Sequence, residues 1–218
     1  MPPAPTDFQA QWRDRLASGS KLSSKALSQA LKDDPTRLAL IVPLAADARS
    51  TVRVCALRAL EEVGHAKPQL LAVYAREIVQ ALALPEPDAQ AAALSVLTSI
   101  APYARAEAAL ALPLVAELLA AKRPALREEA ARCLGRLGSE TPEHAHAAAI
   151  RLSDALRGSK SPRAAQEARE ILGALEAMLP HLAVDERARV ALAVAPLRAH
   201  PNIQVRERAG RVSRMLAP

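Results

Sequence analysis

Aromatic residues are nearly absent from this sequence, since Phe8, Trp12, Tyr74 and Tyr103 are the only four among 218 residues. Glycine is also scarce, at seven residues, whereas half of the chain is hydrophobic and alanine and leucine supply much of that half. The β-branched and aromatic enrichment that favours strands is missing, and alanine and leucine favour helices. We therefore expect an all-α protein whose small side chains must pack closely.

Long apolar runs are missing as well. No segment offers about 18 uncharged apolar residues, the length that a membrane span would need. The start, MPPAPTDFQAQW, lacks the basic segment followed by an apolar run that is typical of a secretory signal. Cys55 and Cys133 fall in helical, mostly apolar patterns, which predicts buried thiols rather than a disulfide or a metal site. We expect a cytoplasmic protein without a membrane partner.

The sequence also lacks the motifs of a catalytic or nucleotide-binding site. Gly135 and Gly138 are three residues apart in a helical pattern, and no Gly-Lys-Ser/Thr follows them, so we assign them to helix packing and termination. His144 and His146 are two residues apart, so on a helix they point in different directions and do not share a metal ion. We expect no enzyme activity, no cofactor and no metal.

A recurring apolar pattern is the strongest positive signal. In STVRVCALRALEEVG, the residues Val52, Ala56, Ala59, Leu60 and Val63 share one helical face, and the following Gly64 could end the helix. Steps of 37, 37, 38 and 41 residues reach the same pattern again, starting at Ala89, Leu126, Ala164 and Val205. An apolar segment about one helix long precedes each copy. The chain therefore reads as a series of antiparallel helical hairpins, the signature of a helical solenoid.

Two segments carry a resemblance to a known family. The first repeat reads P-L-A-A-D-A-R-S-T-V-R from Pro43 to Arg53, and the last reads P-L-R-A-H-P-N-I-Q-V-R from Pro196 to Arg206, with proline and the Val-Arg pair in the same register. This resembles the HEAT-repeat family. The resemblance implies a right-handed α-solenoid of about six hairpins, and a ladder between repeats built from Asp and Val-Arg. Asp47 has no aspartate counterpart in the other repeats, so the ladder is expected to be incomplete.

The same resemblance predicts one domain over residues 1–218, in which 7–34 form a divergent capping pair of helices and 35–217 form five HEAT-like repeats. Pro43, Pro113 and Pro196 fall inside the first helices of hairpins. Because proline lacks an N–H and its ring clashes with the preceding turn, it should bend or break those helices.

Arginines recur at two repeat positions, one occupied by Arg58, Arg132 and Arg211 and the other by Arg53, Arg127 and Arg206. In HEAT stacks the second helices line the concave face, so the first series could form a basic row there. The alternative is that these arginines are solvated or paired with nearby glutamates. Ser95 and Thr98 belong to a stretch of small residues that leaves room between charged ends. The candidate site comprises Arg58, Arg132, Arg136, Arg211, Arg214, Ser95 and Thr98.

These observations favour a non-catalytic HEAT-repeat scaffold that binds a protein or peptide on its concave surface, because solenoids offer extended surface. The formal charge of +6 and a pI near 9.8 leave a second hypothesis open. In that hypothesis the arginine row binds a nucleic-acid backbone without reading its sequence.

Overall fold

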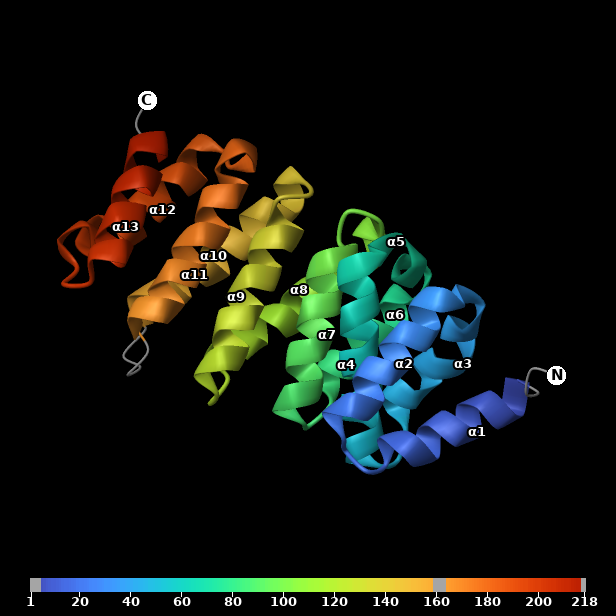
Figure 1. The fold of residues 1–218 in the computed structure, drawn as a ribbon. Helices are drawn as coiled ribbons and strands as arrows, with labels where there is room; N and C mark the ends of the chain where they lie inside the picture. Colours follow the sequence, from blue (N-terminus) through green and yellow to red (C-terminus); the bar gives the residue numbers. More distant parts are fainter. Residues whose placement is uncertain (1–4, 159–163, 217–218) are drawn as a thin grey trace. The chain divides into compact units, whose positions relative to one another are not determined.

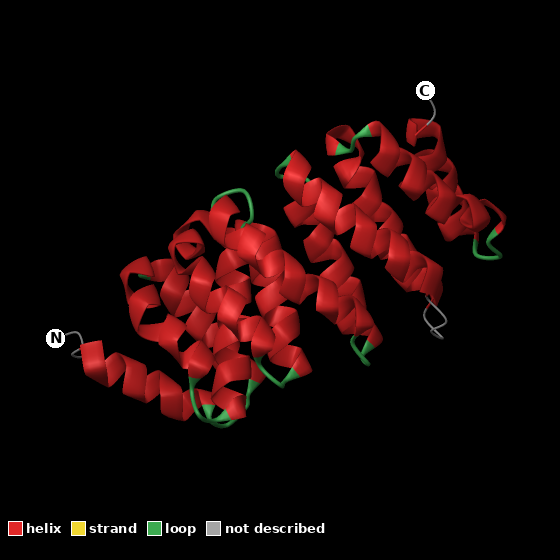
Figure 2. Ribbon diagram, turned by 180° about the vertical axis from the view of Figure 1, so that it is seen from behind, coloured by secondary structure: helices red, strands yellow, loops and turns green. Residues whose placement is uncertain are grey.

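The computed structural model describes residues 5–158 and 164–216, and every regular element in these ranges is helical (Figure 2). The prediction of an all-α fold is confirmed. No helix in the described ranges is long and apolar enough to cross a membrane. The chain forms two compact units, Met1–Glu107 and Ala108–Pro218, and the boundary falls in the first turn of helix α8 (Arg105–Glu117). The single domain expected from the sequence stays a prediction.

Four long helices form the frame of the first unit, and shorter helical pieces join the last three of them. The long helices are α1 (Pro5–Leu16), α2 (Lys21–Asp33), α4 (Ser50–Ala66) and α7 (Pro87–Ile100). The short pieces are η1 (Pro35–Arg37), α3 (Leu38–Ile41), η2 (Val42–Ala46), α5 (Pro68–Leu71), η3 (Ala72–Tyr74), α6 (Ala75–Gln80) and η4 (Ala81–Ala83). Helix α4 packs against both α2 and α7, so these three second helices lie side by side (Figure 1).

The second unit repeats this arrangement with longer first helices. After α8 come η5 (Leu118–Ala120), α9 (Pro124–Gly138), α10 (Pro142–Gly158), α11 (Ala164–Met178), η6 (Leu179–His181), α12 (Val184–Val194), η7 (Ala195–Ala199) and α13 (Ile203–Leu216). The second helices α9, α11 and α13 pack in a row, with α11 between the other two, while α10 packs against α9 and α12 (Figure 1).

The three internal prolines act on the first helices in two ways. At Pro43 and Pro196 the α-helix ends and a 3₁₀ segment begins. The proline is the second residue of η2 or η7, and it lacks the N–H that would continue the α-helical hydrogen bonds. Breaks at these two positions confirm the prediction. Pro113 instead lies inside α8, which continues to Glu117.

The predicted apolar faces form the core. All five pattern positions of α4, α7 and α9 are buried, and in α11 and α13 only Ala164 and Leu216 are partly exposed. Cys55 and Cys133 are buried thiols, as predicted. Gly138 ends α9, but Gly64 does not end α4, which continues to Ala66 because its backbone keeps helical hydrogen bonds as far as Lys67.

Helices α9 and α11 approach so closely at Gly135 that no side chain fits there. A Cβ atom added to Gly135 would lie 2.6 Å from both the Cα and the Cβ of Ala174. Real Cβ atoms do not come this close to backbone, so the two helices would have to separate. At Gly173 the nearest atom is instead the Nη2 of Arg208, at the far end of a flexible side chain that can move away.

We expect Gly135→Ala to destabilise the second unit by about 1–3 kcal/mol, because the overpacking exceeds the gain in helix propensity of about 1 kcal/mol. Gly173→Ala is the matched control in the neighbouring helix, and we expect it to be neutral or stabilising. Urea denaturation followed by circular dichroism measures both. Equal midpoints for the two variants would contradict the close approach.

Leu134 is fully buried on the repeated apolar face of α9. We expect Leu134→Asp to lower the free energy of unfolding by about 3 kcal/mol or more, because it buries an unpaired charge. The control is Leu192→Asp in α12, where the leucine is 74% exposed and the aspartate would remain solvated. Thermal melts of both variants test the register, which is wrong if Leu134→Asp melts like the parent.

Candidate protein-binding surface

The predicted arginines all lie on second helices. Arg58 belongs to α4, Arg132 and Arg136 to α9, and Arg211 and Arg214 to α13. Because the helices α9, α11 and α13 pack side by side, their outward residues form one continuous face of the second unit, which we call the second-helix face. Helices α2, α4 and α7 form the corresponding face of the first unit.

Each member of the first arginine series is paired with an acidic residue of a neighbouring second helix. Arg58 Nη2 lies 3.1 Å from Asp88 Oδ2. Arg211 Nε lies 3.4 Å from Glu176 Oε1. These pairs run from α4 to α7 and from α13 to α11, so they connect helices that are adjacent within one unit.

Arg132 shows the same arrangement with two carboxylates. Its Nε lies 3.5 Å from Glu170 Oε2 of α11, and its Nη1 contacts Glu129 in its own helix. Burial lowers the pKa of Arg132, but Glu129 and Glu170 raise it by more, so the net pKa lies above the ordinary value. The three arginines of the candidate row therefore form ion pairs between neighbouring second helices. This agrees with the alternative interpretation, in which the arginines are paired with acidic residues.

The other candidate residues differ in exposure. Arg136 lies 3.6 Å from Glu140, and Arg214 is exposed and forms no ion pair with an acidic residue in the described ranges. Ser95 is buried, and its Oγ lies 3.0 Å from His65 Nε2, so its hydroxyl is not presented to solvent. Thr98 is half-buried and donates to the Leu94 carbonyl at 2.8 Å. The small-residue stretch of α7 thus serves mostly as core.

Each arginine of the second series donates hydrogen bonds to the turn that precedes its own second helix. Arg53 Nη1 donates to the carbonyls of Asp47 and Ala48 at 2.7 and 3.0 Å. Its Nη2 pairs with Glu86, the residue immediately before α7. One guanidinium therefore hydrogen-bonds the carbonyls of the turn in its own repeat and also pairs with the carboxylate just before the next second helix.

The same geometry recurs two repeats later, at Arg127. Arg127 Nη1 donates to the carbonyls of Ala121 and Lys122 at 2.7 and 3.1 Å, and Nη2 pairs with buried Glu167 of α11. Arg206 Nη1 donates to the His200 carbonyl at 2.9 Å. A ladder between repeats is thus present, but its acidic partners are not the aspartates that the resemblance suggested.

Sequence reasoning missed Glu86 and Glu167. Glu86 follows Arg53 by 33 residues and Glu167 follows Arg127 by 40, so no fixed spacing connects acid and base. Both glutamates lie at or near the start of the next second helix, where a carboxylate is favoured by the exposed N–H groups. That local preference is the only signal that could have pointed to them.

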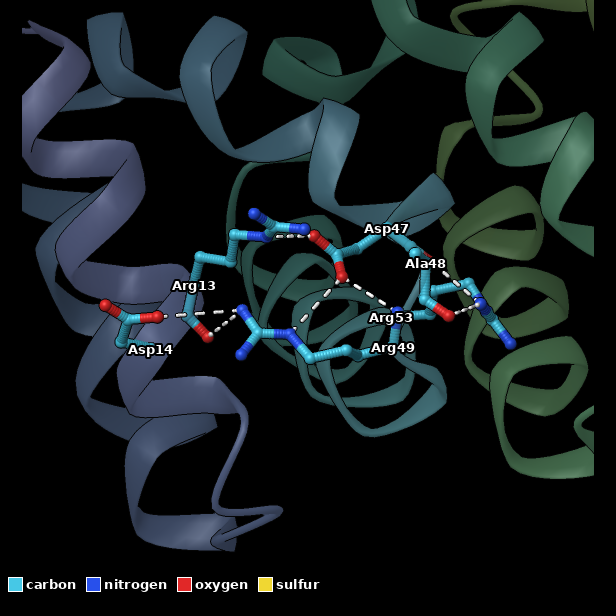
Figure 3. A network of polar contacts seen from close by, with 6 residues as sticks. All are labelled: Arg13, Asp14, Asp47, Ala48, Arg49 and Arg53. Atoms are coloured by element: carbon cyan, nitrogen blue, oxygen red, sulfur yellow. Dashed lines mark hydrogen bonds and ion pairs between the residues drawn. The ribbon is translucent and has the colours of Figure 1, made fainter.

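Asp47 has a different role, which joins the capping helix α1 to the first repeat (Figure 3). Its side chain, 5% exposed, accepts from Arg13 Nε and from the Arg49 backbone N–H at 2.9 Å. Arg49 Nη2 in turn lies 3.7 Å from Asp14. Burial raises the pKa of Asp47, but the Arg49 N–H and the Arg13 guanidinium lower it by more, so the net pKa is below the ordinary value. The carboxylate therefore stabilises the fold above its unfolded pKa and loses that contribution as the pH falls through the folded pKa.

The histidines form no metal centre in the part of the chain that the structure describes, where no group of three potential ligands occurs. His146 Nδ1 pairs with Glu186 of α12, so it links two first helices. His144 is half-buried in α10, and its backbone N–H donates to the Thr141 hydroxyl oxygen at 3.2 Å.

Comparison with solved structures identifies the fold. A designed armadillo repeat protein aligns with 99% of this chain and 95% of its own length, at 18% identity and a TM-score of 0.70. A designed armadillo repeat protein in complex with the peptide (KR)4 aligns over the same shares, with a TM-score of 0.72 and 18% identity. An engineered protein from a structural genomics consortium aligns with 99% of this chain and 92% of its own, at 19% identity and a TM-score of 0.71.

These likenesses show a helical-repeat solenoid fold. At identities below one fifth they assign the fold alone, and they do not distinguish HEAT from armadillo repeats. No family model and no curated protein matches the sequence.

The turn-clamping role of Arg127 predicts a large effect on stability. Arg127 is 18% exposed and Glu167 only 6%, so Arg127→Ala removes the guanidinium from a buried carboxylate and two carbonyls. We expect a loss of about 2–4 kcal/mol in the free energy of unfolding. Arg206→Ala, at the equivalent but exposed position, should cost less than about 1 kcal/mol. Denaturant titration measures the free energy of unfolding of both variants. Equal losses would contradict the role of Arg127 in holding the turn and Glu167.

Proposed function

We propose that this protein is a non-catalytic, cytoplasmic scaffold of HEAT-like repeats that binds a protein or peptide on its second-helix faces. In helical-repeat proteins these helices present an extended surface suited to long partners. The observation that carries the proposal is the pairing of Arg58, Arg132 and Arg211 with Asp88, Glu170 and Glu176. Acidic and basic groups alternate across neighbouring helices, which complements the mixed charges of a protein better than the uniform charge of polyphosphate.

The solved structure of a designed armadillo repeat protein with the peptide (KR)4 supports a peptide as ligand for a fold of this kind. In this chain a peptide of that charge would meet the exposed arginines Arg132 and Arg136. Like charges facing each other oppose binding, so the partner should carry acidic groups where it crosses α9. The register shared by the Val-Arg pairs at Arg53 and Arg206, and by Leu126-Arg127, supports HEAT-like repeats.

The proposal is tested by photo-crosslinking in a native lysate, with and without nuclease treatment. A photoreactive residue replaces Arg132 on the second-helix face, and a matched one replaces exposed Leu192 on first helix α12. We expect specific protein adducts from position 132 and few from position 192. Adducts confined to position 192, or capture that disappears after nuclease treatment, would contradict the proposal.

A direct measurement addresses the nucleic-acid hypothesis. We expect the parent protein to bind labelled duplex DNA weakly or not at all at physiological salt, because acidic residues neutralise the arginine row. Tight, salt-sensitive binding that is abolished by the triple variant Arg58→Glu, Arg132→Glu and Arg211→Glu, with the helical signal intact, would make nucleic-acid binding the better assignment.

A further inference from the structure

The second unit contains an apolar pocket between the first helices α8 and α10, which we call the α8–α10 pocket. Its lining residues all belong to this unit. Three of them are buried and form its floor, namely Leu112, Leu134 and Ala148. Three others are exposed and form its rim, namely Pro113, Ala147 and Arg151. The pocket is therefore open to solvent above a closed apolar base.

Small side chains on both walls leave this space open. The α10 wall includes Ala147 and Ala148, and the α8 wall includes Pro113 and Ala116. Because alanine side chains fill little volume, a cavity of about 130 Å³ remains between the two helices. Close-packed cores contain few voids of this size, since the atoms that line a void lose their packing partners. A ligand that fills the pocket would restore those contacts.

The size of the pocket matches one apolar side chain. An apolar cavity of about 150 Å³ accommodates one benzene molecule, and a leucine side chain is of similar size. The rim continues the apolar surface, because Leu110 is 66% exposed and lies one turn before Pro113 on the same face of α8. An exposed leucine beside an apolar pocket is typical of a surface that binds another protein.

Arg151 supplies the charge of the pocket. It is exposed at the rim and forms no ion pair with an acidic residue in the parts of the chain that the structure describes. Asp154, one turn further along α10, is paired with Arg157 instead, at 3.0 Å. The Arg151 guanidinium is therefore available to a carboxylate, which it can bind through two parallel hydrogen bonds.

We infer that the α8–α10 pocket binds a leucine side chain of a partner protein, and that Arg151 binds a carboxylate next to that leucine in the partner's sequence. The apolar floor buries the side chain, and the single charged group at the rim sets its orientation. The occupant is a protein segment rather than a small free acid. The pocket holds only one side chain, whereas the apolar rim extends to Leu110 and offers further surface to a chain that crosses α8.

The inference goes beyond the proposed function, because the pocket lies on the first helices and requires neither Arg132 nor Arg136 of the second-helix face. Crosslinking at position 132 and binding in the pocket are independent measurements. Failure of one proposal is therefore distinguishable from failure of the other.

The test uses the full chain and short peptides, with binding followed by NMR of the isotope-labelled methyl groups of Leu112 and Leu134. The probe is acetyl-Ala-Leu-Asp-Ala-amide, and two further peptides replace its aspartate with asparagine or its leucine with alanine. We expect saturable methyl shifts with the probe. Binding should be at least about threefold weaker with the asparagine peptide, which lacks the charge that Arg151 pairs with. It should be at least about tenfold weaker with the alanine peptide, which buries less apolar surface.

Two variants with matched controls locate the binding site. Arg151→Gln should weaken binding of the aspartate peptide at least about threefold and leave that of the asparagine peptide unchanged. Arg189→Gln makes the same charge change on exposed α12 and should leave both within about twofold, because screening limits distant charges. Ala147→Leu fills the pocket from its rim and should abolish the shifts, whereas Ala188→Leu on exposed α12 should preserve them. Circular dichroism confirms that each variant folds.

Three outcomes would overturn the inference. Absence of methyl shifts with the aspartate peptide would show that the pocket binds no leucine side chain. Equal affinities for the aspartate and asparagine peptides would show that Arg151 does not bind a carboxylate there. Tighter binding of N-acetyl-leucine than of the aspartate peptide would assign the pocket to a small free acid instead of a partner protein.

Discussion

Neighbouring second helices can approach one another only as far as their facing side chains allow, and in this chain the facing positions are small. Gly135 lies against Ala174 with no room for a methyl group. A core with so few aromatic residues gains little from each side chain, so its stability depends on such close contact along every helix. The arginine clamps and lateral ion pairs are possible because the close packing brings helix starts within reach of the preceding repeat.

The polar contacts then fix how each repeat meets the next within a unit. Arg53 and Arg127 each join a turn, a second helix and an acidic residue of the following helix. Because these guanidinium groups are largely buried, their hydrogen bonds specify geometry as well as stability. The more exposed pairs, such as that of Arg58 with Asp88, contribute less energy but determine which charges remain available to a partner.

This distribution of charge sets the character of the second-helix faces. On the second-helix faces, acidic and basic residues neutralise one another across neighbouring helices. In α13, Arg206 makes the same turn contact as Arg53 and Arg127, through the His200 carbonyl.

Much of the fold could be read from the sequence, because the apolar pattern at Val52, Ala89, Leu126, Ala164 and Val205 depends only on helical periodicity. Proline chemistry likewise placed the breaks at Pro43 and Pro196. The acidic partners of the arginines could not be read, since Glu86 and Glu167 stand at different distances from Arg53 and Arg127. The burial of Ser95 also escaped prediction, because it depends on how closely α4 and α7 pack. Periodicity is a property of one helix and is written in the sequence, whereas the pairing of charges between helices exists only once the helices have packed.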